Sequence, residues 1–498
     1  MVHDVLVVGA GFGGLGAALT LAEGGARVVL CESLAYPGGC ASTFTRRGWS
    51  FETGATLFAG LGEGQLLRGW IARHGLPVEV VLPSEPVELR APGVRLAVPS
   101  DRSAFVTRML AAVPVDTRPA VRGFLDAQGR AADALWSLFS DPARLLPFGP
   151  GGLVRHVAEL PRTAPLARYL GRSCARVLEA HGVARVEPLR TWLDAVCQIT
   201  VQCGVDEAEA LFAMAAMDYP FRGAGHVRGG IGVLAHALCG AITSLGGEVR
   251  LASRVTALAR EDGVWVAEAR GTRIRARQVV ANVLPGALAG LLDAGGGALR
   301  GGAAPPPQAL GEIQRAVDSG WGACMLYLGL PTGVPAREDG HHIEIVQDRA
   351  RPYTEGNHLF ASVSAADESR GPGRTVTVST HVPLATLRDL PEAERGPWVA
   401  AVQARMAEGL DGFAPELVGA VERMTASPRT WARFTRRPGG AVGGIPRRVG
   451  IRPYLRLGPT EVLPGMWMIG DSVMLGQSVL ATALAGLKTA ERLLRVGR

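Results

Sequence analysis

A glycine-rich turn between two apolar segments near the start of the chain constrains its fold more than any other feature. The run Val5–Val8 is apolar throughout, which is typical of a strand buried in a parallel sheet. Gly9, Gly11 and Gly14 follow in the spacing G-x-G-x-x-G and lead into an alanine-rich stretch with helical spacing. A second apolar segment then ends at Glu32, 18 residues after Gly14. This order of strand, helix and strand with a terminal acid predicts a dinucleotide-binding unit.

The residue types at these positions each have a physical role in holding a dinucleotide. Gly9 permits the tight turn, Gly11 lets the backbone approach a diphosphate, and Gly14 lets the helix pack closely on the strand. The helix start offers unpaired N–H groups and the positive end of a dipole to the diphosphate. The Glu32 carboxylate can accept both ribose hydroxyls of an adenosine and would repel a 2′-phosphate, so NADP is disfavoured.

A second glycine pair, Gly38 and Gly39, follows the acid. At this point the sequence resembles the large FAD-dependent family that includes amine oxidases, protoporphyrinogen oxidase and phytoene desaturase. In that family the pair is usually followed by an arginine. Here Cys40 stands in its place, which is similar to the carotenoid desaturase and isomerase branch. The resemblance also implies that the stretch 54–58 forms a loop near the flavin ring.

The C-terminal segment resembles the other half of the same cofactor site. A short apolar strand pattern at 463–469 ends in Gly470 and Asp471, and a helical pattern runs from about 480 to 494. In the resembled family, the carboxylate of such a Gly-Asp pair hydrogen-bonds the ribityl chain of FAD. The start of the helix would face the pyrimidine end of the flavin, where a helix N-terminus stabilises negative charge.

A third stretch completes the resemblance. The glycine pair Gly229-Gly230 begins a helical pattern that turns into a strand reaching Val255, whose backbone would contact adenine. The apolar run 279–285 would return to the same sheet. From these motifs we expect the cofactor site to contain Gly9, Gly11, Phe12, Gly13, Gly14, Glu32, Gly38, Gly39, Cys40, Ala41, Ser42, Gly54, Ala55, Thr56, Val255, Gly470, Asp471, Gly476, Gln477 and Ser478.

The positions of these motifs predict an α/β protein with a discontinuous cofactor domain. We expect a Rossmann-like FAD-binding domain of the amine-oxidase (GR2) type, built from residues 1–100, 215–300 and 450–498. The inserts 101–214 and 301–449 would form an α+β substrate domain that faces a membrane. Alternating runs at 343–346 and 376–380 fit strands of a mixed sheet, and 301–307 reads as a surface linker.

Charge and hydropathy suggest a membrane surface as the partner rather than nucleic acid. The net charge is +7, yet we find no long basic run, zinc-ligand spacing or RNA-binding aromatic motif. The mean hydropathy is +0.18, and segment 135–170 mixes large apolar residues with arginines, as an amphipathic layer on a bilayer would. A plain helical layer of the substrate domain is the alternative for this segment. Apolar runs stay shorter than 18 residues, which argues against a spanning helix.

Cysteine usage predicts a reducing compartment. The seven cysteines are scattered and form no C-x-x-C pair, which favours free thiols. We therefore expect a cytoplasmic protein that associates peripherally with the inner face of a membrane.

Two further stretches, 219–227 and 341–381, resemble the carotenoid branch. They imply an FAD-dependent oxidoreductase acting on an apolar isoprenoid polyene, most simply a carotenoid desaturase that passes a C–H hydride to flavin N5. The alternatives are a carotenoid cis–trans isomerase using reduced FAD, an amine or porphyrinogen oxidase, and a non-catalytic FAD-bound scaffold. Many amine oxidases use a lysine near flavin N5, whereas the only lysine here, Lys488, is expected to face solvent on the last helix.

The catalytic residues are less defined than the cofactor site. His226, Arg222 and Glu52 are candidates because they lie within the family-like stretches. A metal site is not expected, because the adjacent His341 and His342 would point to opposite faces of a strand.

Overall fold

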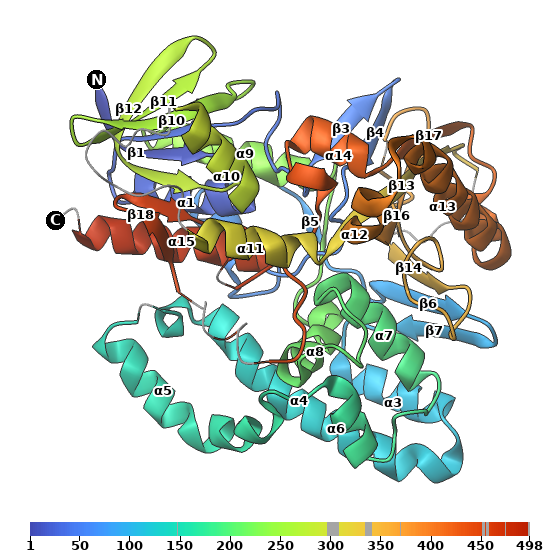
Figure 1. Cartoon of the computed structure of the whole chain (residues 1–498). Coiled ribbons are helices and arrows are strands. Elements are labelled where there is room, and N and C mark those ends of the chain that lie inside the picture. The colour runs from blue at the N-terminus through green and yellow to red at the C-terminus, as the bar shows by residue number, and fades with distance from the viewer. Residues whose placement is uncertain are drawn as a thin grey trace.

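Two β-sheets and a layer of helices make up the computed structural model of the chain (Figure 1). The structure describes residues 1–146, 148–295, 308–333, 341–368, 370–450, 454, 458–473 and 475–496. The stretch 301–307, expected to be a linker, lies outside the described residues.

The first sheet is the parallel sheet that the glycine motif predicts. Its strands follow the order β10-β11-β12-β1-β2-β9, with β19 beside β12 and β18 beside β19. β1 pairs in parallel with β2, which follows it closely in the sequence, and with β12, which is far from it. The strands β10, β11 and β12 form an antiparallel meander. The strands are β1 (Val2–Val8), β2 (Val28–Cys31), β9 (Glu248–Arg250), β10 (Val255–Glu261), β11 (Val264–Ala269), β12 (Thr272–Ala281), β18 (Thr460–Leu463) and β19 (Met466–Met468).

Alternating side chains of β1 pack on helices at both faces of this sheet. Val5 and Val7 lie in one core cluster with α1 (Phe12–Glu23), α2 (Leu66–Arg73), α9 (Ile231–Ser244) and α15 (Val479–Val496). Leu6 and Val8 lie in another with α10 (Pro285–Ala294) and α11 (Gln308–Asp318). Burial on both faces explains why the β1 sequence is continuously apolar.

The two ends of the chain meet because small residues let α1 and α15 approach closely. A Cβ atom at Gly486 would lie 2.1 Å from the Gly13 carbonyl oxygen, and one at Gly16 would lie 2.7 Å from the Ala483 carbonyl oxygen. The segment after β19 is therefore held against the segment after β1.

The second sheet is mixed and lies beside the first. Its order is β17-β13-β16-β15-β14-β6-β7, in which only the β14–β6 pair is parallel. One face packs on α13 (Glu392–Phe413). The strands are β6 (Val87–Ala91), β7 (Val94–Val98), β13 (Trp321–Leu330), β14 (His341–Val346), β15 (His358–Val363), β16 (Arg374–Pro383) and β17 (Glu422–Ala426), so the strands expected at 343–346 and 376–380 are confirmed.

The helical layer lies next to the second sheet, in the lower half of Figure 1. Its long helix α4 (Arg118–Ser140) begins with proline in the first turn, a position where proline's missing N–H costs nothing. The other helices of the layer are α3 (Arg102–Ala112), α5 (Pro150–Thr163), α6 (Cys174–Ala180), α7 (Leu189–Thr200) and α8 (Ala210–Met217). The remaining elements are β3 (Thr43–Arg46), β4 (Trp49–Glu52), β5 (Val80–Val81), β8 (His226–Val227), α12 (Leu384–Asp389) and α14 (Pro428–Thr435).

The division between the two sheets differs from the expected boundary at residue 100. β6 and β7 fall before that residue, yet β6 pairs with β14 of the second sheet. The sequence did not reveal this because a strand pattern carries no information on which distant strand it will join.

Two expectations about the whole chain can be compared with the structure. All seven cysteines are free thiols, as their spacing suggested, and six of them are buried. Among the described residues, no helix is both long and apolar enough to cross a bilayer.

Candidate functional site

A large cavity runs from the first sheet into the space between the second sheet and the helical layer. Its volume is about 1050 Å³, at the upper end of the ~300–1,000 Å³ typical of small-molecule sites. The wall takes residues from the carboxyl ends of β1 and β2, from β13, β15 and β16, and from α4, α5 and α8. In folds with an open parallel sheet, ligands bind outside the carboxyl ends of the strands, at the point where the strand order reverses.

The glycine loop after β1 has the geometry that a diphosphate requires. Gly9 has a φ of +98°, and a Cβ atom at Gly14 would lie only 1.9 Å from the Gly9 carbonyl oxygen. Gly11 is the N-cap of α1, where no described side chain caps the helix and no acid stands in its first turn. The N-terminal N–H groups of α1 therefore remain available to an anion at the cavity wall.

The second glycine pair lies directly against the first motif. Gly38 forms an isolated parallel bridge with Gly11, and the Gly38 N–H donates to the Ala10 carbonyl oxygen at 2.7 Å. Both glycines of the pair have positive φ, +105° for Gly38 and +64° for Gly39. A side chain at either position would be strained, which explains the requirement for glycine.

Glu32 follows β2 in the cavity wall and is only 6% exposed. Its Oε2 accepts the Ala10 N–H at 2.7 Å, while its Oε1 accepts the Leu34 N–H at 2.8 Å and the Ser33 hydroxyl at 3.0 Å. Since each carboxylate oxygen accepts about two hydrogen bonds, Oε2 can accept about one more donor. The carboxylate thus has room for about one further donor besides its three protein partners.

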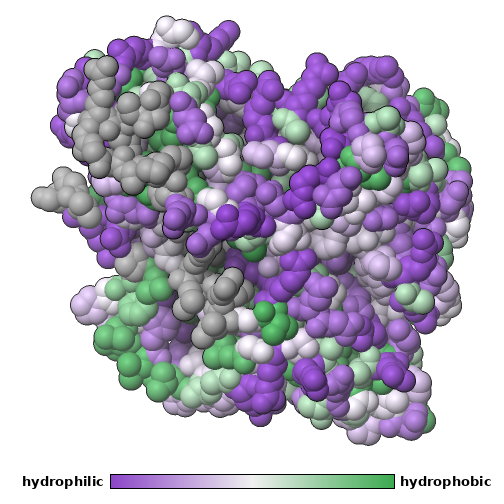
Figure 2. All heavy atoms as spheres, viewed as in Figure 1, coloured by the Kyte–Doolittle hydropathy of each residue, from purple (hydrophilic) through white to green (hydrophobic). Residues whose placement is uncertain are grey.

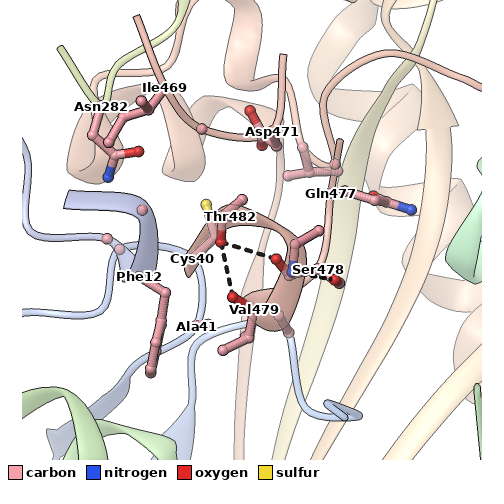
Figure 3. Close-up of a pocket in the computed structure, with 18 of the residues that line it drawn as sticks. Phe12, Cys40, Ala41, Asn282, Ile469, Asp471, Gln477, Ser478, Val479 and Thr482 are labelled. Atoms are coloured by element: carbon pink, nitrogen blue, oxygen red, sulfur yellow. Dashed lines mark hydrogen bonds between the residues drawn. The ribbon is translucent and has the colours of Figure 1, made fainter. Parts of the chain in front are cut away.

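The C-terminal motif lies near the N-terminal one in the cavity wall (Figure 3). β19 pairs in parallel with β12, so Gly470 and Asp471 lie just beyond the sheet edge. Asp471 Oδ2 accepts a charged hydrogen bond from Arg437 Nη2 at 2.6 Å. Ser478, with a φ of +116°, accepts the Ala481 N–H at 3.0 Å and so caps α15.

Cys40 lies in the same part of the wall as this ion pair. Burial raises the pKa of the Cys40 thiol, against a smaller opposing effect of the Arg437 charge. Arg437, from a distant segment, thus places a guanidinium near the position where the resembled family carries its arginine. No local sequence pattern indicated this arrangement, because Arg437 lies almost 400 residues after Cys40.

The structure brings most of the expected cofactor residues together. Those that line the cavity are Gly9, Gly11, Phe12, Gly13, Glu32, Gly38, Gly39, Cys40, Ala41, Gly54, Ala55, Thr56, Val255, Gly470, Asp471, Gln477 and Ser478. Gly14, Ser42 and Gly476 lie behind this wall. Gly14 packs on Gly9, and the Ser42 hydroxyl donates to the Pro37 carbonyl oxygen at 2.5 Å.

None of the three catalytic candidates belongs to the described cavity wall. His226 Nε2 lies 2.6 Å from Glu368 Oε2, and Arg222 is ion-paired with Asp218 at 2.6 Å. Glu52 accepts the Thr43 hydroxyl at 3.0 Å and lies 3.3 Å from Arg370. These side chains are held by their partners in ion-pair networks. Asp218 is only four residues from Arg222, whereas Glu368 and Arg370 are far in sequence from His226 and Glu52, so a local pattern does not reveal those pairs.

The expectation for Lys488 was also wrong. Its side chain is only 2% exposed and pairs with Glu491 at 2.7 Å, although both residues belong to the last helix as predicted. Lys488 lies outside the cavity wall, so it is not positioned to act on a ligand there.

Sequence reasoning missed the wall that the second sheet supplies. Ala323, Met325, Phe360, Ser379 and His381 all point into the cavity from one face of the sheet. The alternation of residues 379 and 381 along one strand was a signal for a shared face. The pattern did not show which face of the sheet lines the cavity.

His381 is the histidine that this sheet contributes to the wall. Burial lowers its pKa to about 4, so the imidazole is neutral at pH 7. Its Nδ1 lies 3.2 Å from Gln198 Nε2, which fixes the ring as the acceptor of an amide hydrogen. The side chain therefore presents a neutral, positioned ring rather than a charge.

Asn282 is a second missed residue and follows β12 directly. Its side-chain Nδ2 lies 3.4 Å from the Gly9 carbonyl oxygen, and a Cβ atom at Gly13 would lie 2.7 Å from Asn282 Oδ1. Asn282 thus fills the space that the glycines leave beside the helix start, opposite Phe12 in Figure 3.

The far arm of the cavity is apolar. It is lined by Leu135, Trp136, Leu138, Phe139, Leu145, Leu146 and Phe148 from the α4–α5 region, and by Phe212, Ala215 and Ala216 of α8. The charged residues near this arm are arginines. Arg144 is 6% exposed, and the Arg447 guanidinium lies 5.3 Å from the Phe212 ring centre. Desolvation lowers the pKa of Arg447 to about 10, so its charge persists at neutral pH.

The described residues contain no cluster of three or more histidine, cysteine, aspartate or glutamate side chains that could hold a metal ion.

Comparisons with known proteins agree on one family. The model of the family "Flavin containing amine oxidoreductase" matches residues 12–494. The chain is 25% identical over 510 residues to the chloroplastic prolycopene isomerase of Arabidopsis thaliana, covering 98% of this chain and 82% of that protein. A stretch of 65 residues, 13% of this chain and 11% of the relative, is 45% identical to all-trans-retinol 13,14-reductase of Homo sapiens.

Solved structures show a similar fold. An oxidoreductase from Methanosarcina mazei aligns with a TM-score of 0.65 at 17% identity, covering 98% of this chain and 100% of that one. Putrescine oxidase bound to putrescine aligns with a TM-score of 0.61 at 17% identity, covering 100% of both chains. At such identities the likeness concerns the fold alone.

Proposed function

The chain belongs to the flavin-containing amine oxidoreductase family, and from this premise we propose that it is an FAD-dependent oxidoreductase acting on an apolar isoprenoid polyene. The observation that carries the proposal is the shape and chemistry of one continuous cavity. One end has an uncapped helix start and a carboxylate, and the other is an apolar arm with arginines as its charged residues.

The residues of the first end fit FAD. The free N–H groups at the start of α1 suit a diphosphate, and Glu32 Oε2 can accept one ribose hydroxyl. Asp471 and the start of α15 lie farther along, where the ribityl chain and the ring would reach. Gly11 and Gly39 leave the backbone accessible to the cofactor. A side chain at either position would fill the space beside the backbone or be strained.

The protein's contribution to the chemistry is orientation and the exclusion of water. When bound, FAD supplies a two-electron acceptor at its ring. The arm formed by Trp136, Phe139 and Phe148 would align a long hydrocarbon by shape, because a polyene offers little to hydrogen-bond. His381 keeps its ring neutral in this wall, so a developing positive charge on the substrate is not repelled there.

The charges of the wall disfavour an amine substrate. The acidic residues of the described wall are Glu32, at the adenosine end, and Asp471, which is paired with Arg437. An ammonium group in the apolar arm would meet Arg144 and Arg447 and would lack a free carboxylate. We therefore consider an amine oxidase a less favoured function than an enzyme that acts on a polyene.

Desaturation and cis–trans isomerisation remain two reactions that one such site could support. We propose desaturation first, and isomerisation is the second candidate because the full-length relatives include prolycopene isomerases. The test is expression in hosts that accumulate carotenoids of known saturation and geometry, followed by chromatography and mass measurement of the pigments. A product two mass units lighter would indicate desaturation, and a product of equal mass with a shifted spectrum would indicate isomerisation. Unchanged pigments in all hosts, with the protein present and loaded with flavin, would contradict the proposal.

Replacing Asp471 with alanine is expected to weaken FAD binding. The change removes a proposed ribityl acceptor and leaves the buried Arg437 without its ion-pair partner. Charge-assisted hydrogen bonds contribute about 1.5–3 kcal/mol, so we expect the Kd to rise roughly tenfold to a hundredfold. The measurement is titration of apoprotein with FAD, followed by the quenching of flavin fluorescence and by bands near 375 and 450 nm, which are approximate values for oxidised flavin.

The matched control is Asp389→Ala. Asp389 is also paired with a neighbouring arginine, Arg388, but its side chain is 71% exposed. This variant should bind FAD as the parent does. An Asp471→Ala protein with unchanged FAD affinity would remove Asp471 from the proposed cofactor site.

A further inference from the structure

Helix α5 exposes an apolar face on the surface of the molecule. Leu153, Val154, Val157 and Leu160 are 53%, 68%, 61% and 57% exposed, which is unusual for large apolar side chains. Their spacing of one, three and three residues places them on one side of the helix. We call these four residues the α5 patch. Figure 2 shows apolar residues gathered in this lower-left region, where Figure 1 places α5.

A neighbouring side of α5 faces the cavity. Gly152 is buried, and His156 lines the cavity while its Nε2 lies 2.7 Å from the Arg144 carbonyl oxygen. The helix is thus a thin wall, with the cavity on its inner side and the α5 patch on its outer side.

One residue of the cavity wall is also exposed beside this patch, and we take this point as the opening of the cavity. Leu146 lines the apolar arm and is 43% exposed, so it belongs to both the cavity and the outer surface. It lies in the segment between α4 and α5, and Leu170, which is 49% exposed, follows shortly after α5. Six of the exposed large apolar residues therefore fall within residues 146–170, next to the apolar arm.

Positive charge borders the patch. Segment 141–172 contains five arginines and two acids, Asp141 and Glu159. The Arg155 side chain is neutralised by Asp141 at 2.7 Å, whereas Arg162 is 80% exposed and only 3.4 Å from Glu159, and Arg172 is exposed. An apolar face with an excess of arginines complements an anionic lipid surface.

We propose that the α5 patch docks on the surface of an anionic bilayer, with its apolar side chains at the depth of the acyl boundary and its arginines at the headgroups. In this position the opening near Leu146 faces the lipid. A polyene dissolved in the bilayer can then enter the apolar arm without crossing water. This last step rests on the proposed function, whereas the docking itself rests on the surface alone.

A second copy of the chain is a poorer occupant of the same surface. In a two-fold dimer the patch meets itself, which brings the bordering arginines of both copies into one interface. Like charges across an interface disfavour association. Anionic headgroups instead offer each arginine an opposite charge.

The test compares two double variants in sedimentation with vesicles. Val154→Glu with Val157→Glu places two acids in the patch, and Val115→Glu with Val421→Glu places two acids at valines that are 71% and 66% exposed elsewhere. Val115 precedes α4, whose 23 residues separate it from α5 by roughly 35 Å, and Val421 adjoins β17 on the far side in Figure 1. The control therefore matches the number, type and exposure of the changes.

Vesicles of phosphatidylcholine alone and with phosphatidylglycerol separate the apolar and charged contributions. We expect the parent and the control pair to bind anionic vesicles, and the patch variant to partition at least about tenfold less. Replacing Arg162 and Arg172 with glutamine should reduce binding to anionic vesicles by about fivefold per arginine. Equal binding by the patch variant and the control would overturn the proposal. Equal binding of the parent to neutral vesicles would overturn the choice of an anionic surface.

Two further readouts keep this proposal separate from the proposed function. The patch variant should keep the flavin absorbance and the turnover of detergent-dispersed polyene, because the cavity lining is unchanged. Vesicle binding without turnover of any polyene would support docking and contradict the proposed function. Dimerisation of the parent through the patch, measured by ultracentrifugation and lost in the patch variant, with no vesicle binding, would assign the surface to a second copy and overturn the proposal.

Discussion

Replacing Glu368 with glutamine is expected to lower the free energy of unfolding by about 3 kcal/mol at pH 7, because breaking a buried ion pair costs about 3–5 kcal/mol and Arg370 keeps a second partner. Glu368 contacts two side chains that come from different parts of the chain. Its Oε1 pairs with Arg370 at 2.7 Å, and its Oε2 accepts a hydrogen bond from His226 Nε2 at 2.6 Å. Arg370 is only 2% exposed and also lies 3.3 Å from Glu52.

The pH dependence of this effect has a defined sign. Burial alone would raise the pKa of Glu368, but the His226 hydrogen bond, the Arg370 charge and the Gly229 N–H outweigh it and lower the pKa to about 2. A carboxyl whose pKa is lowered in the folded state stabilises the protein fully above its ordinary pKa of 4.5. That stabilisation is lost as the pH falls from about 4.5 towards 2, so the parent and the variant should converge in this window.

The measurement is denaturant unfolding of both proteins at pH 7 and at pH 3. Glu392→Gln serves as the control, since Glu392 pairs with Arg395 at 2.7 Å but is 72% exposed. Exposed pairs contribute about 0–1 kcal/mol, so this change should be nearly silent. A difference between parent and Glu368→Gln that stays constant from pH 7 to pH 3 would show that the charge of Glu368 is not the source of the stability.

Replacing Gly14 with alanine is expected to abolish FAD binding and to destabilise the fold by about 1–3 kcal/mol or more, because overpacking forces backbone shifts of that cost. The added Cβ atom would lie 1.9 Å from the Gly9 carbonyl oxygen and 3.1 Å from its carbon. Neither atom can rotate away, since both belong to the backbone of the turn. The start of α1 must move, and with it the N–H groups that would hold the diphosphate.

A matched glycine in another helix provides the comparison. Gly240 lies in α9, and a Cβ atom there would meet no other atom within 4 Å. Gly240→Ala should therefore bind FAD normally and gain up to about 1 kcal/mol of stability, from the higher helix propensity of alanine. Flavin content after purification and thermal unfolding report both quantities. A Gly14→Ala protein that retains its flavin would contradict the close packing of α1 on β1.

The cofactor end of the site was readable from the sequence because its chemistry depends on the backbone. Gly9, Gly38 and Gly470 have positive φ. Such positions favour glycine, so they can be recognised in the sequence as glycines in a fixed spacing. The apolar run Val5–Val8 is likewise explained by burial on both faces of one sheet. These features are local, so a single segment contains all the information needed to recognise each of them.

The catalytic candidates lie outside the described cavity wall for a related reason. His226, Arg222 and Glu52 were chosen for their chemistry and their place in a family-like stretch, and their partners Glu368, Asp218 and Arg370 were not considered. A charged side chain can act on a ligand only where it reaches the cavity, and these three side chains are turned towards their protein partners instead. The distinction depends on the neighbours, which can be more than 100 residues away.

The sequence by itself therefore determined where the backbone must turn, which strands are buried and where the two halves of a dinucleotide site begin. Only the tertiary structure decided which side chains share the cavity, such as Arg437 beside Cys40 and Asp471, and His381 on the opposite sheet. It also decided that β6 and β7 join the second sheet and that α5 leaves one apolar face uncovered. The physical reason is that glycine conformation and hydrophobic period act over a few residues, whereas pairing and exposure depend on the packing of the whole chain.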